Sequence, residues 1–298
     1  MNGVIHLDLQ QLKYFQTVAR MEHMTKASEK LNISQPALSK AIERLEGEIG
    51  APLFDRVGRS IRLNRFGRIF LERTLPLTTI FEEAKQEIQD LQSPNSGTVF
   101  VGFTHSMGTQ ILSKMVRLFQ QKNPNIQFEF IQRNSQHLLE DLSEGKCDLC
   151  LTPLVDTELN IEWQGLWNEE VYVVVPANHP LAMKEAIFIK EIAEEPIITI
   201  KEGNSLRQIQ TKAFAHAGIT PNIVFEGEEF HTVASFVEAG FGVGLLPSLH
   251  KLDGYHVKRL SIKDFQCERQ LGIVTMKNRY LPEVAKKFMQ FINEHLEK

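Results

Sequence analysis

A run of hydrogen-bonding side chains lies between residues 34 and 44 and alternates with apolar ones. Gln35 carries the amide that pairs with adenine, and Lys40 or Arg44 can donate to guanine or to a phosphate. Ser39 can bond to either kind of base edge or to a phosphate. The chemistry expected of this set is recognition of DNA, provided that one helix presents all four side chains on the same side.

The apolar residues of the same stretch recur at helical spacing and predict a helix from about Gln35 to Glu48. Ser34 is a good N-cap for this helix, and Pro36 falls in its first turn, where a missing N–H costs nothing. One face should meet a core and consists of Ala37, Leu38, Ala41, Ile42, Leu45 and Ile49. The opposite face is polar and should meet DNA.

Two patterns precede this helix. The first predicts a helix from about Asp8 to Met21, and the second predicts a short helix with Thr25 as its N-cap. Asn32 can adopt the left-handed conformation of a sharp turn before the third helix. A short helix, a three-residue turn and a helix with a polar N-terminal half form a helix-turn-helix, whose second helix enters the major groove.

Arginines surround the "VGRS" turn that follows and predict a basic hairpin, a wing that tracks phosphates. We expect Arg56, Arg59, Arg62 and Arg65 on this hairpin. Asn64 can cap the next helix, so that the helix N-terminus also points at a phosphate. The expected DNA-binding residues are Thr25, Ser34, Gln35, Pro36, Ser39, Lys40, Arg44, Arg56, Arg59 and Asn64.

The charge distribution agrees with a DNA-binding head. Residues 1–68 hold eleven Lys and Arg against seven Asp and Glu, a balance of +4, whereas the other 230 residues hold 22 against 30, a balance of −8. Only the head should attract a polyanion. With 298 residues, of which 42% are hydrophobic, the chain is long enough for two or three domains.

The sequence favours a cytoplasmic location. No apolar run approaches the roughly 18 residues of a membrane span, and the N-terminus has polar residues where a signal peptide needs an apolar core. Three cysteines are too few for a disulfide framework, which agrees with a reducing compartment.

The stretch from Asp8 to Gly67 resembles the N-terminal domain of the LysR-type transcriptional regulators over about 60 residues. The matching positions are Phe15, Ala27, Leu31, Ser34, Gln35, Pro36, Ala37, Ser39, Ile42, Leu45, Glu46, Gly50, Leu53, Phe54, Arg56 and Gly67. Asn64 replaces the threonine that the family has before its linker helix, and it keeps a cap. The resemblance implies a winged helix-turn-helix DNA-binding domain over residues 1–65, a dimerisation linker helix over 66–93 and an effector-binding domain over 94–298.

The linker sequence carries an apolar stripe of the kind that pairs between subunits. The stripe consists of Phe66, Ile69, Phe70, Leu77, Ile80, Phe81, Ala84, Ile88 and Leu91. Pro76 predicts a kink, or a junction between two segments, near Arg73. We expect a homodimer, and a homotetramer built from it, because symmetric half-sites need two recognition helices. The alternative is a helix folded onto its own domain.

Beyond "SPNSG", strands and helices alternate and predict an α/β domain with a mostly parallel sheet. A second round of strands and helices begins near residue 166, and the last strand and helix return to the first round. We therefore expect lobe I over about 94–165 and 266–298, and lobe II over about 166–265. The fold class is mixed: an all-α winged helix-turn-helix with a linker helix, then a two-lobed α/β effector domain that resembles periplasmic binding proteins.

Ligands of parallel α/β sheets sit outside the carboxyl ends of the strands, beside helix N-termini. This rule selects Thr104, His105, Ser106, Thr152, Glu202, Asn204, Ser205, Glu228 and Gly244 as effector-binding residues. The family resemblance implies hydroxyl or backbone contacts at Thr104, Ser106, Thr152 and the "EGNS" loop. For each hydroxyl residue, a simple N-cap role is the alternative.

The sequence contains no recognisable catalytic constellation, so we expect no enzyme, cofactor or metal. Cys147 and Cys150 have the spacing of a redox or zinc pair, but on a strand their side chains would point to opposite faces. The expected function is a sequence-specific transcriptional regulator whose partners are double-stranded promoter DNA, a small-molecule effector, a second copy of the chain and RNA polymerase. The alternative is a small-molecule-binding or catalytic α/β protein with an N-terminal dimerisation module.

Overall fold

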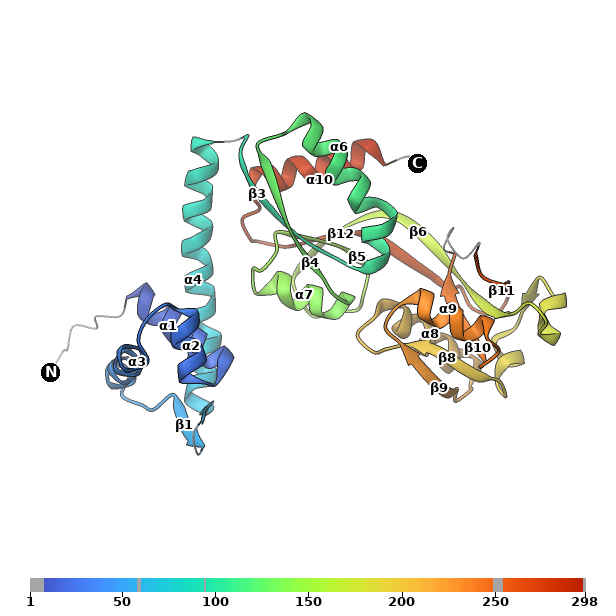
Figure 1. Cartoon of the computed structure of the whole chain (residues 1–298), viewed down its shortest axis with the longest axis horizontal. Helices are drawn as coiled ribbons and strands as arrows, with labels where there is room; N and C mark the ends of the chain where they lie inside the picture. Colours follow the sequence, from blue (N-terminus) through green and yellow to red (C-terminus); the bar gives the residue numbers. More distant parts are fainter. Residues whose placement is uncertain (1–7, 58–59, 94, 249–253, 297–298) are drawn as a thin grey trace. The chain divides into compact units, whose positions relative to one another are not determined.

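A computed structural model describes residues 8–57, 60–93, 95–248 and 254–296 (Figure 1). The chain divides into two compact units, residues 1–89 and 90–298. Each unit has a hydrophobic core of its own. Within the described ranges, no helix combines the length and the apolar character that a membrane crossing requires.

The first unit packs helices and a hairpin around Phe15, which is fully buried. The Phe15 ring lies 5.5 Å from the Phe54 ring and 5.1 Å from the Phe70 ring, measured between centroids. The elements are α1 Leu9–Met21, α2 Met24–Lys30, α3 Gln35–Ile49, β1 Phe54–Val57, β2 Ser60–Leu63 and α4 Arg65–Gln92. The hairpin β1–β2 joins the recognition helix to the long helix α4.

The predicted cap of α2 is wrong. The helix begins one residue before Thr25, and the ring nitrogen Nδ1 of His23 accepts the Lys26 N–H at 3.4 Å. Thr25 is instead an exposed residue of the first turn. Hydroxyl residues are common caps, but the position is decided by the backbone, and His23 has the extended conformation that a cap needs, with φ of −150°.

The recognition helix α3 begins as the sequence predicts. Ser34 Oγ accepts the Ala37 N–H at 3.3 Å, and Asn32 provides the left-handed turn before it, with φ of 54°. The buried residues of α3 are Leu38, Ile42 and Leu45. Ala37 and Ile49 are exposed, so the side of the helix that faces the core is narrower than the sequence pattern predicts.

Helix α4 runs unbroken from Arg65 to Gln92, so a junction between two segments near Arg73 is wrong. Gln16 of α1 supports the helix on both sides of Pro76. Its Nε2 donates to the Thr74 carbonyl at 3.1 Å, and its Oε1 accepts from the Thr78 hydroxyl at 3.2 Å. These contacts are buried and hold the proline turn in place.

The start of α4 is fixed by two close contacts. Asn64 Oδ1 accepts the Gly67 N–H at 2.9 Å, which confirms Asn64 as the cap. A Cβ atom on Gly67 would lie 2.1 Å from the Leu53 carbonyl oxygen, so this helix turn admits only glycine without a shift of the backbone.

The second unit is built on strands arranged in the order β4-β3-β5-β12-β6-β10-β8-β9, with β11 beside β6 and β7. The strands are β3 Gly97–Phe103, β4 Ile126–Gln132, β5 Leu149–Pro153, β6 Ile161–Pro176, β7 Ala186–Ile187, β8 Pro196–Ile200, β9 Asn222–Gly227, β10 Val243–Pro247, β11 Val257–Ile262 and β12 Glu268–Met276. The helices are α5 His105–Met107, α6 Ser113–Lys122, α7 Ser135–Ser143, α8 Ser205–Ala217, α9 Phe230–Glu238 and α10 Glu283–His295. A single π-helical turn, Gly108–Leu112, joins α5 to α6, and short 3₁₀ turns cover Pro180–Met183 and Ile189–Ile192.

Two long strands connect two lobes. β12 pairs antiparallel with β6 from Ile161 to Glu170, and the rest of β6, from Val171 onward, pairs with β10 and β11. Lobe I therefore contains β3 to β5, α5 to α7 and α10, and lobe II contains β7 to β11, α8 and α9. Parallel pairs β3–β4, β3–β5, β8–β9 and β8–β10 form the body of each lobe, which confirms the two-lobed α/β fold.

The last helix returns to lobe I, as the sequence predicts. Figure 1 shows α10 beside α6, and the ring centroids of Phe288 and Phe119 lie 5.2 Å apart between them. Lobe II has a separate core in which α8 and α9 cover the strands through Leu206 and Val233. The strand ends between the lobes are thus held by two independent cores.

We expect Gly67→Ala to lower the free energy of unfolding of the first unit by about 1–3 kcal/mol, the usual range for overpacking a tight site. Gly47→Ala is the matched control, because a Cβ on this helical glycine meets no atom within 4 Å. The control should be neutral or stabilise by roughly 1 kcal/mol through helix propensity. Urea unfolding followed by circular dichroism measures both, and a Gly67→Ala protein as stable as the wild type would contradict the packing argument.

Candidate functional site

The side chains expected to read DNA lie on the outward side of α3. Gln35, Pro36, Lys40 and Arg44 are exposed, and Ser39 is half-buried. Ser39 Oγ lies 3.4 Å from Glu43 Oε1, and Arg44 Nε lies 3.1 Å from Glu48 Oε1. Ser39 and Arg44 must therefore exchange an intrahelical partner for any bond to DNA.

The hairpin arginines do not all share one surface. Asp55 pairs with Arg62 and Arg56 pairs with Ile61, and directly paired residues point to the same face of a hairpin. Arg56 and Arg62 therefore point to opposite faces, and both are exposed. Arg65 is the first residue of α4, so its expected place on the hairpin is wrong. Arg59 lies outside the described residues.

Glu46 links the recognition helix to the hairpin. Its Oε1 accepts the backbone N–H of Leu53 at 2.7 Å and that of Phe54 at 3.3 Å. One carboxylate thus satisfies two backbone donors at the start of the wing and sets the wing relative to α3. Sequence reasoning gave Glu46 no role, although its place in the family pattern was the signal.

A cavity of about 210 Å³ lies between the two lobes. Five of the predicted effector residues line it: Thr104, His105, Ser106, Asn204 and Glu228. The cavity is also lined by Gln132, Arg133, Asn134, Ser135, Pro153, Glu229, Phe230 and Arg269. We call this cavity the cleft.

Four predicted effector residues do not line the cleft. Thr152 is fully buried and its hydroxyl donates to the Pro153 carbonyl at 3.2 Å. Glu202 lines a different cavity, on lobe II. Gly244 lies under α9, where a Cβ atom would be 3.4 Å from Val233. Ser205, the first residue of α8, is buried and does not line the cleft, whereas the cap residue Asn204 does.

Two helix N-termini from opposite lobes meet at the cleft. Asn134 caps α7 by accepting the His137 N–H at 3.0 Å, and Asn204 caps α8 by accepting the Leu206 N–H at 3.0 Å. The Gln136 N–H donates to the Gly203 carbonyl at 3.1 Å, so a backbone hydrogen bond joins the lobes directly. The partial positive charges of both helix ends therefore act on the same small space.

Polar groups beside this space lack partners among the described residues. Ser135 and Ser205, each only 1% exposed, have hydroxyl oxygens without a hydrogen bond. Arg269, 2% exposed, is by contrast paired with Glu169: its Nε lies 2.6 Å and its Nη2 2.5 Å from Glu169 Oε2. Buried polar groups are normally paired, so the hydroxyl of Ser135, which lines the cleft, indicates a polar ligand.

The electrostatics of the cleft are mixed. Burial of the Arg269 guanidinium lowers its pKa, and the neighbouring Glu169 carboxylate opposes that shift. Burial raises the pKa of Glu229, and the nearby His105, at 3.9 Å, opposes it. The guanidinium of Arg269 lies over the Phe230 ring, 4.8 Å from its centroid. The cleft is thus lined by a guanidinium that is paired with Glu169 and by the carboxyl group of Glu229, whose pKa is raised by burial.

Known proteins resemble the chain over almost its full length. Residues 9–68 match the family described as bacterial regulatory helix-turn-helix protein, lysR family, and residues 92–297 match the LysR substrate binding domain. The HTH-type transcriptional regulator YybE of Bacillus subtilis (strain 168) is 46% identical over 289 residues, covering 97% of this chain and 99% of YybE. The transcriptional dual regulator GltC of the same organism is 32% identical over 295 residues, covering 98% of each chain.

The chain belongs to the LysR family of transcriptional regulators. It is a DNA-binding regulator controlled by a small-molecule effector, with a helix-turn-helix head and a two-lobed effector domain. A solved relative, the effector binding domain of QuiR in complex with shikimate, matches with a TM-score of 0.63 at 29% identity, covering 67% of this chain and 97% of that one.

Several cleft residues of this LysR-type regulator were missed from the sequence. Asn134 and Ser135 follow strand β4, and the strand-end rule that selected Thr104 would also have selected them. Arg269 had no such signal, because it is the second residue of β12, a strand antiparallel to its neighbours, and reaches the cleft through the pairing of β12 with β6.

In this LysR-type regulator, the prediction that the side chains of Cys147 and Cys150 point to opposite faces of one strand is wrong. Strand β5 begins at Leu149, so Cys147 lies in the preceding turn, and its sulfur lies 3.4 Å from that of Cys150. A Cβ on Gly102 would lie 2.6 Å from the Cys150 sulfur, so the absence of a side chain there makes room for the pair. Both thiols are buried, and the hydrogen bond to Cys147, followed by burial, raises the pKa of Cys150.

We expect the cysteines of the folded protein to react slowly with iodoacetamide at neutral pH. The thiolate is the reactive form, and burial raises the pKa of Cys267 to about 12 while Cys150 is raised as well. Labelling followed by mass spectrometry should show that the cysteines react roughly tenfold faster, or more, when guanidinium chloride unfolds the chain. Rapid labelling of Cys150 in the folded protein would contradict the burial of the pair.

Proposed function

We propose that the N-terminal half of α3 reads base edges in the major groove and that the hairpin and the N-terminus of α4 contact phosphates. Gln35, Ser39 and Lys40 are the base-reading or groove-contacting residues, with Pro36 and Arg44 beside them. Ser34 and Thr25, at the exposed starts of their helices, and Arg56, Arg59 and Asn64 would hold the backbone. The proposal is supported by the two faces of α3: its polar face is exposed, and its opposite, apolar face is buried in the core.

We expect Gln35→Ala to relax sequence preference at one position of each half-site by about 1–3 kcal/mol, because the bidentate amide is lost. Arg56→Ala is the contrasting variant and should weaken binding to all sequences alike, with a smaller slope of log affinity against log salt. Binding-site selection and gel shifts at several salt concentrations measure both effects. Uniform weakening by Gln35→Ala would place that residue on the backbone instead.

We propose that α4 pairs with a second copy of the chain to form a homodimer and, from it, a homotetramer. Seven members of its apolar stripe are exposed in the described structure: Phe66, Ile69, Leu77, Ile80, Phe81, Ile88 and Leu91. Phe70 instead packs on Phe15. A solvent-facing apolar stripe of this length needs a partner helix, which supports a dimer over a helix folded onto its own domain.

We propose that residues 1–65, 66–93 and 94–298 act as the DNA-binding, linker and effector-binding parts of a cytoplasmic regulator that is not an enzyme. In the cleft, the Thr104 and Ser106 hydroxyls lie 3.4 Å from each other, and their contact suits ligand binding better than nucleophilic attack. DNA as the partner supports the cytoplasmic location.

The effector, in this proposal, carries an acidic group and lies in the cleft. The single observation that carries it is the meeting of two helix N-termini from opposite lobes at the cleft, beside the unpaired hydroxyl of Ser135. Such groups favour a carboxylate or phosphate. The hydroxyl groups of Thr104 and Ser106 would position the rest of the ligand, and the small cavity limits it to the size of a simple metabolite.

We expect the double variant Thr104→Ala/Ser106→Ala to bind operator DNA with nearly wild-type affinity but to lose its response to the effector. A ligand shifts an equilibrium only through differential affinity for its states, and these hydroxyls supply part of it. A thermal-shift screen of organic acids on the full chain identifies the effector, since binding raises stability by RT ln(1 + [L]/Kd).

The control for that experiment is Ser143→Ala, at the exposed far end of α7. It should keep both DNA binding and the effector response in a promoter-reporter assay. If the double variant switches normally, or if amines rather than acids stabilise the wild type, the proposed site or its ligand chemistry is wrong.

A further inference from the structure

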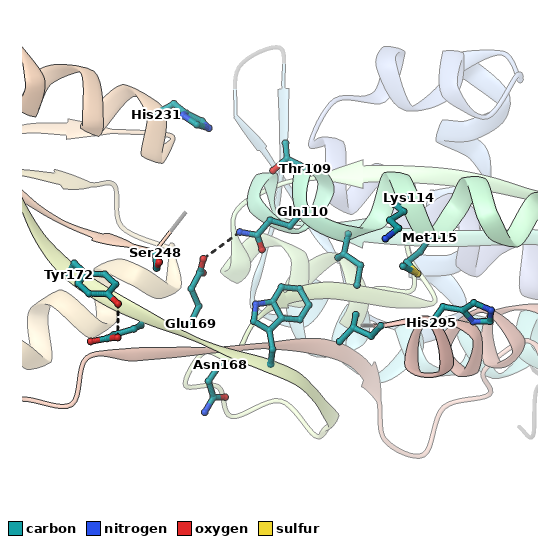
Figure 2. Close-up of a pocket in the computed structure, with 14 residues that line it drawn as sticks. Thr109, Gln110, Lys114, Met115, Asn168, Glu169, Tyr172, His231, Ser248 and His295 are labelled. Atoms are coloured by element: carbon teal, nitrogen blue, oxygen red, sulfur yellow. Dashed lines mark hydrogen bonds between the residues drawn. The ribbon is translucent and has the colours of Figure 1, made fainter. Parts of the chain in front are cut away.

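The two arginines that line the cleft are already paired with carboxylates that do not line it. Arg133 Nε lies 2.9 Å from Oδ2 of the buried Asp141, and Arg269 is paired with Glu169. Figure 2 shows that Glu169 also accepts a hydrogen bond from Gln110, whose Nε2 lies 3.4 Å from Glu169 Oε1. The positive charges of both arginines are therefore neutralised from outside the cleft.

The two glutamates of the cleft have different surroundings. Glu228 forms an ion pair with Lys201 and so has a cation of its own. Glu229 is the N-cap residue of α9, but its side chain accepts no hydrogen bond from that helix. Its Oε2 lies 3.9 Å from His105 Nδ1, which is too long for a hydrogen bond. Among the described residues that line the cleft, Glu229 is thus the carboxylate without a hydrogen-bonded cation.

His105 is already engaged elsewhere. Its Nδ1 lies 3.3 Å from Gln132 Nε2, an amide nitrogen that only donates, so Nδ1 accepts in this contact and has no proton to offer Glu229. Burial raises the pKa of Glu229, His105 opposes this shift when its ring is charged, and Glu228 adds to it. A cation bound against Glu229 would offset the desolvation of its carboxylate.

Other groups of the cleft suit an anion. The N-termini of α7 and α8 meet there, beside the unpaired hydroxyl of Ser135. Ser135 and α7 belong to lobe I, whereas Glu229 and α9 belong to lobe II. The cleft therefore offers donors for a carboxylate and, on the other lobe, an acceptor for a cationic group.

We propose that the effector is an amino acid, whose carboxylate binds at the helix N-termini beside Ser135 and whose ammonium group binds Glu229. This inference rests on the acidic effector proposed above and adds a second, cationic group to it. The cleft, at about 210 Å³, is smaller than the usual pocket for a drug-sized molecule, which agrees with a ligand of this size. The two charged groups of the ligand contact opposite lobes, so one molecule bridges them.

This arrangement selects against both kinds of simple analogue. An organic acid without an amino group leaves the Glu229 carboxylate without a cation. An amine without a carboxylate leaves the Ser135 hydroxyl and the two helix N-termini without an anion. Because a buried polar group that loses its partner is costly, tight binding requires both charged groups in one molecule.

The probes for this proposal are the standard protein amino acids, screened by thermal shift with the full chain. Each amino acid that binds is then compared with the acid that lacks only its amino group, such as succinate for aspartate. Isothermal titration calorimetry gives both affinities. The amino acid should bind about 10- to 100-fold more tightly than its analogue, the ratio expected of one hydrogen bond between charged groups.

The variant that tests the role of Glu229 is Glu229→Gln, which keeps the size of the side chain and removes its charge. It should lower the preference for the amino acid to about 3-fold or less without weakening the analogue. Glu194→Gln is the matched control, because Glu194 is an exposed glutamate of lobe II that does not line the cleft, and it should keep the full preference. Circular dichroism confirms that each variant is folded, and the comparison of ligands on the wild type is decisive without them.

The proposal is overturned if the analogue binds the wild type as tightly as the amino acid does, or if folded Glu229→Gln keeps the full preference. It is equally overturned if organic acids stabilise the wild type and no amino acid does, and the acidic effector of the cleft would then stand alone. If neither amino acids nor other organic acids stabilise the wild type, the acidic effector is wrong together with this inference.

Discussion

Glu169 and Arg269 face each other across β6 and β12, at the point where these strands leave the pairing of lobe I and enter lobe II. Both side chains are buried, and removal of one partner of such a pair typically costs about 3–5 kcal/mol because the other charge stays desolvated. The pair therefore constrains how the two strands cross between the lobes. The cleft is built beside this constraint, because Arg269 is one of its lining residues.

The lobe contact beside the cleft is small and polar. The Gln136–Gly203 hydrogen bond joins the loops that begin α7 and α8, and a Cβ on Gly203 would lie 2.9 Å from the Asn134 side chain. Contacts of this kind can exchange for ligand or water, unlike the separate apolar cores of the lobes. A ligand between the lobes thus acts where the lobes meet through polar contacts rather than through a shared apolar core, and a few kcal/mol of differential binding can shift a population there.

The first unit shows how far local sequence rules reach. The Ser34 cap, the Asn32 turn and the Asn64 cap follow from short-range hydrogen bonds and are as predicted. The Thr25 cap fails because the extended backbone falls at His23, which a preference for hydroxyl side chains does not reveal. The continuity of α4 through Pro76 depends on Gln16, a residue of another helix. A rule based on the residues around Pro76 alone cannot predict that contact.

By itself, the sequence determined the helix-turn-helix head, the linker stripe and the alternation of strands and helices, because hydrophobic period and capping chemistry act over a few residues. It also placed Thr104, Ser106 and Asn204 at strand ends, where the tertiary structure brings them to one cleft. Only the tertiary structure decided that Arg269 and Glu229 join them, that Thr152 and Gly244 do not, and that the Cys147 and Cys150 thiols touch. These outcomes depend on strand register, on where a strand begins and on packing between segments far apart in the chain, and no short-range pattern encodes them.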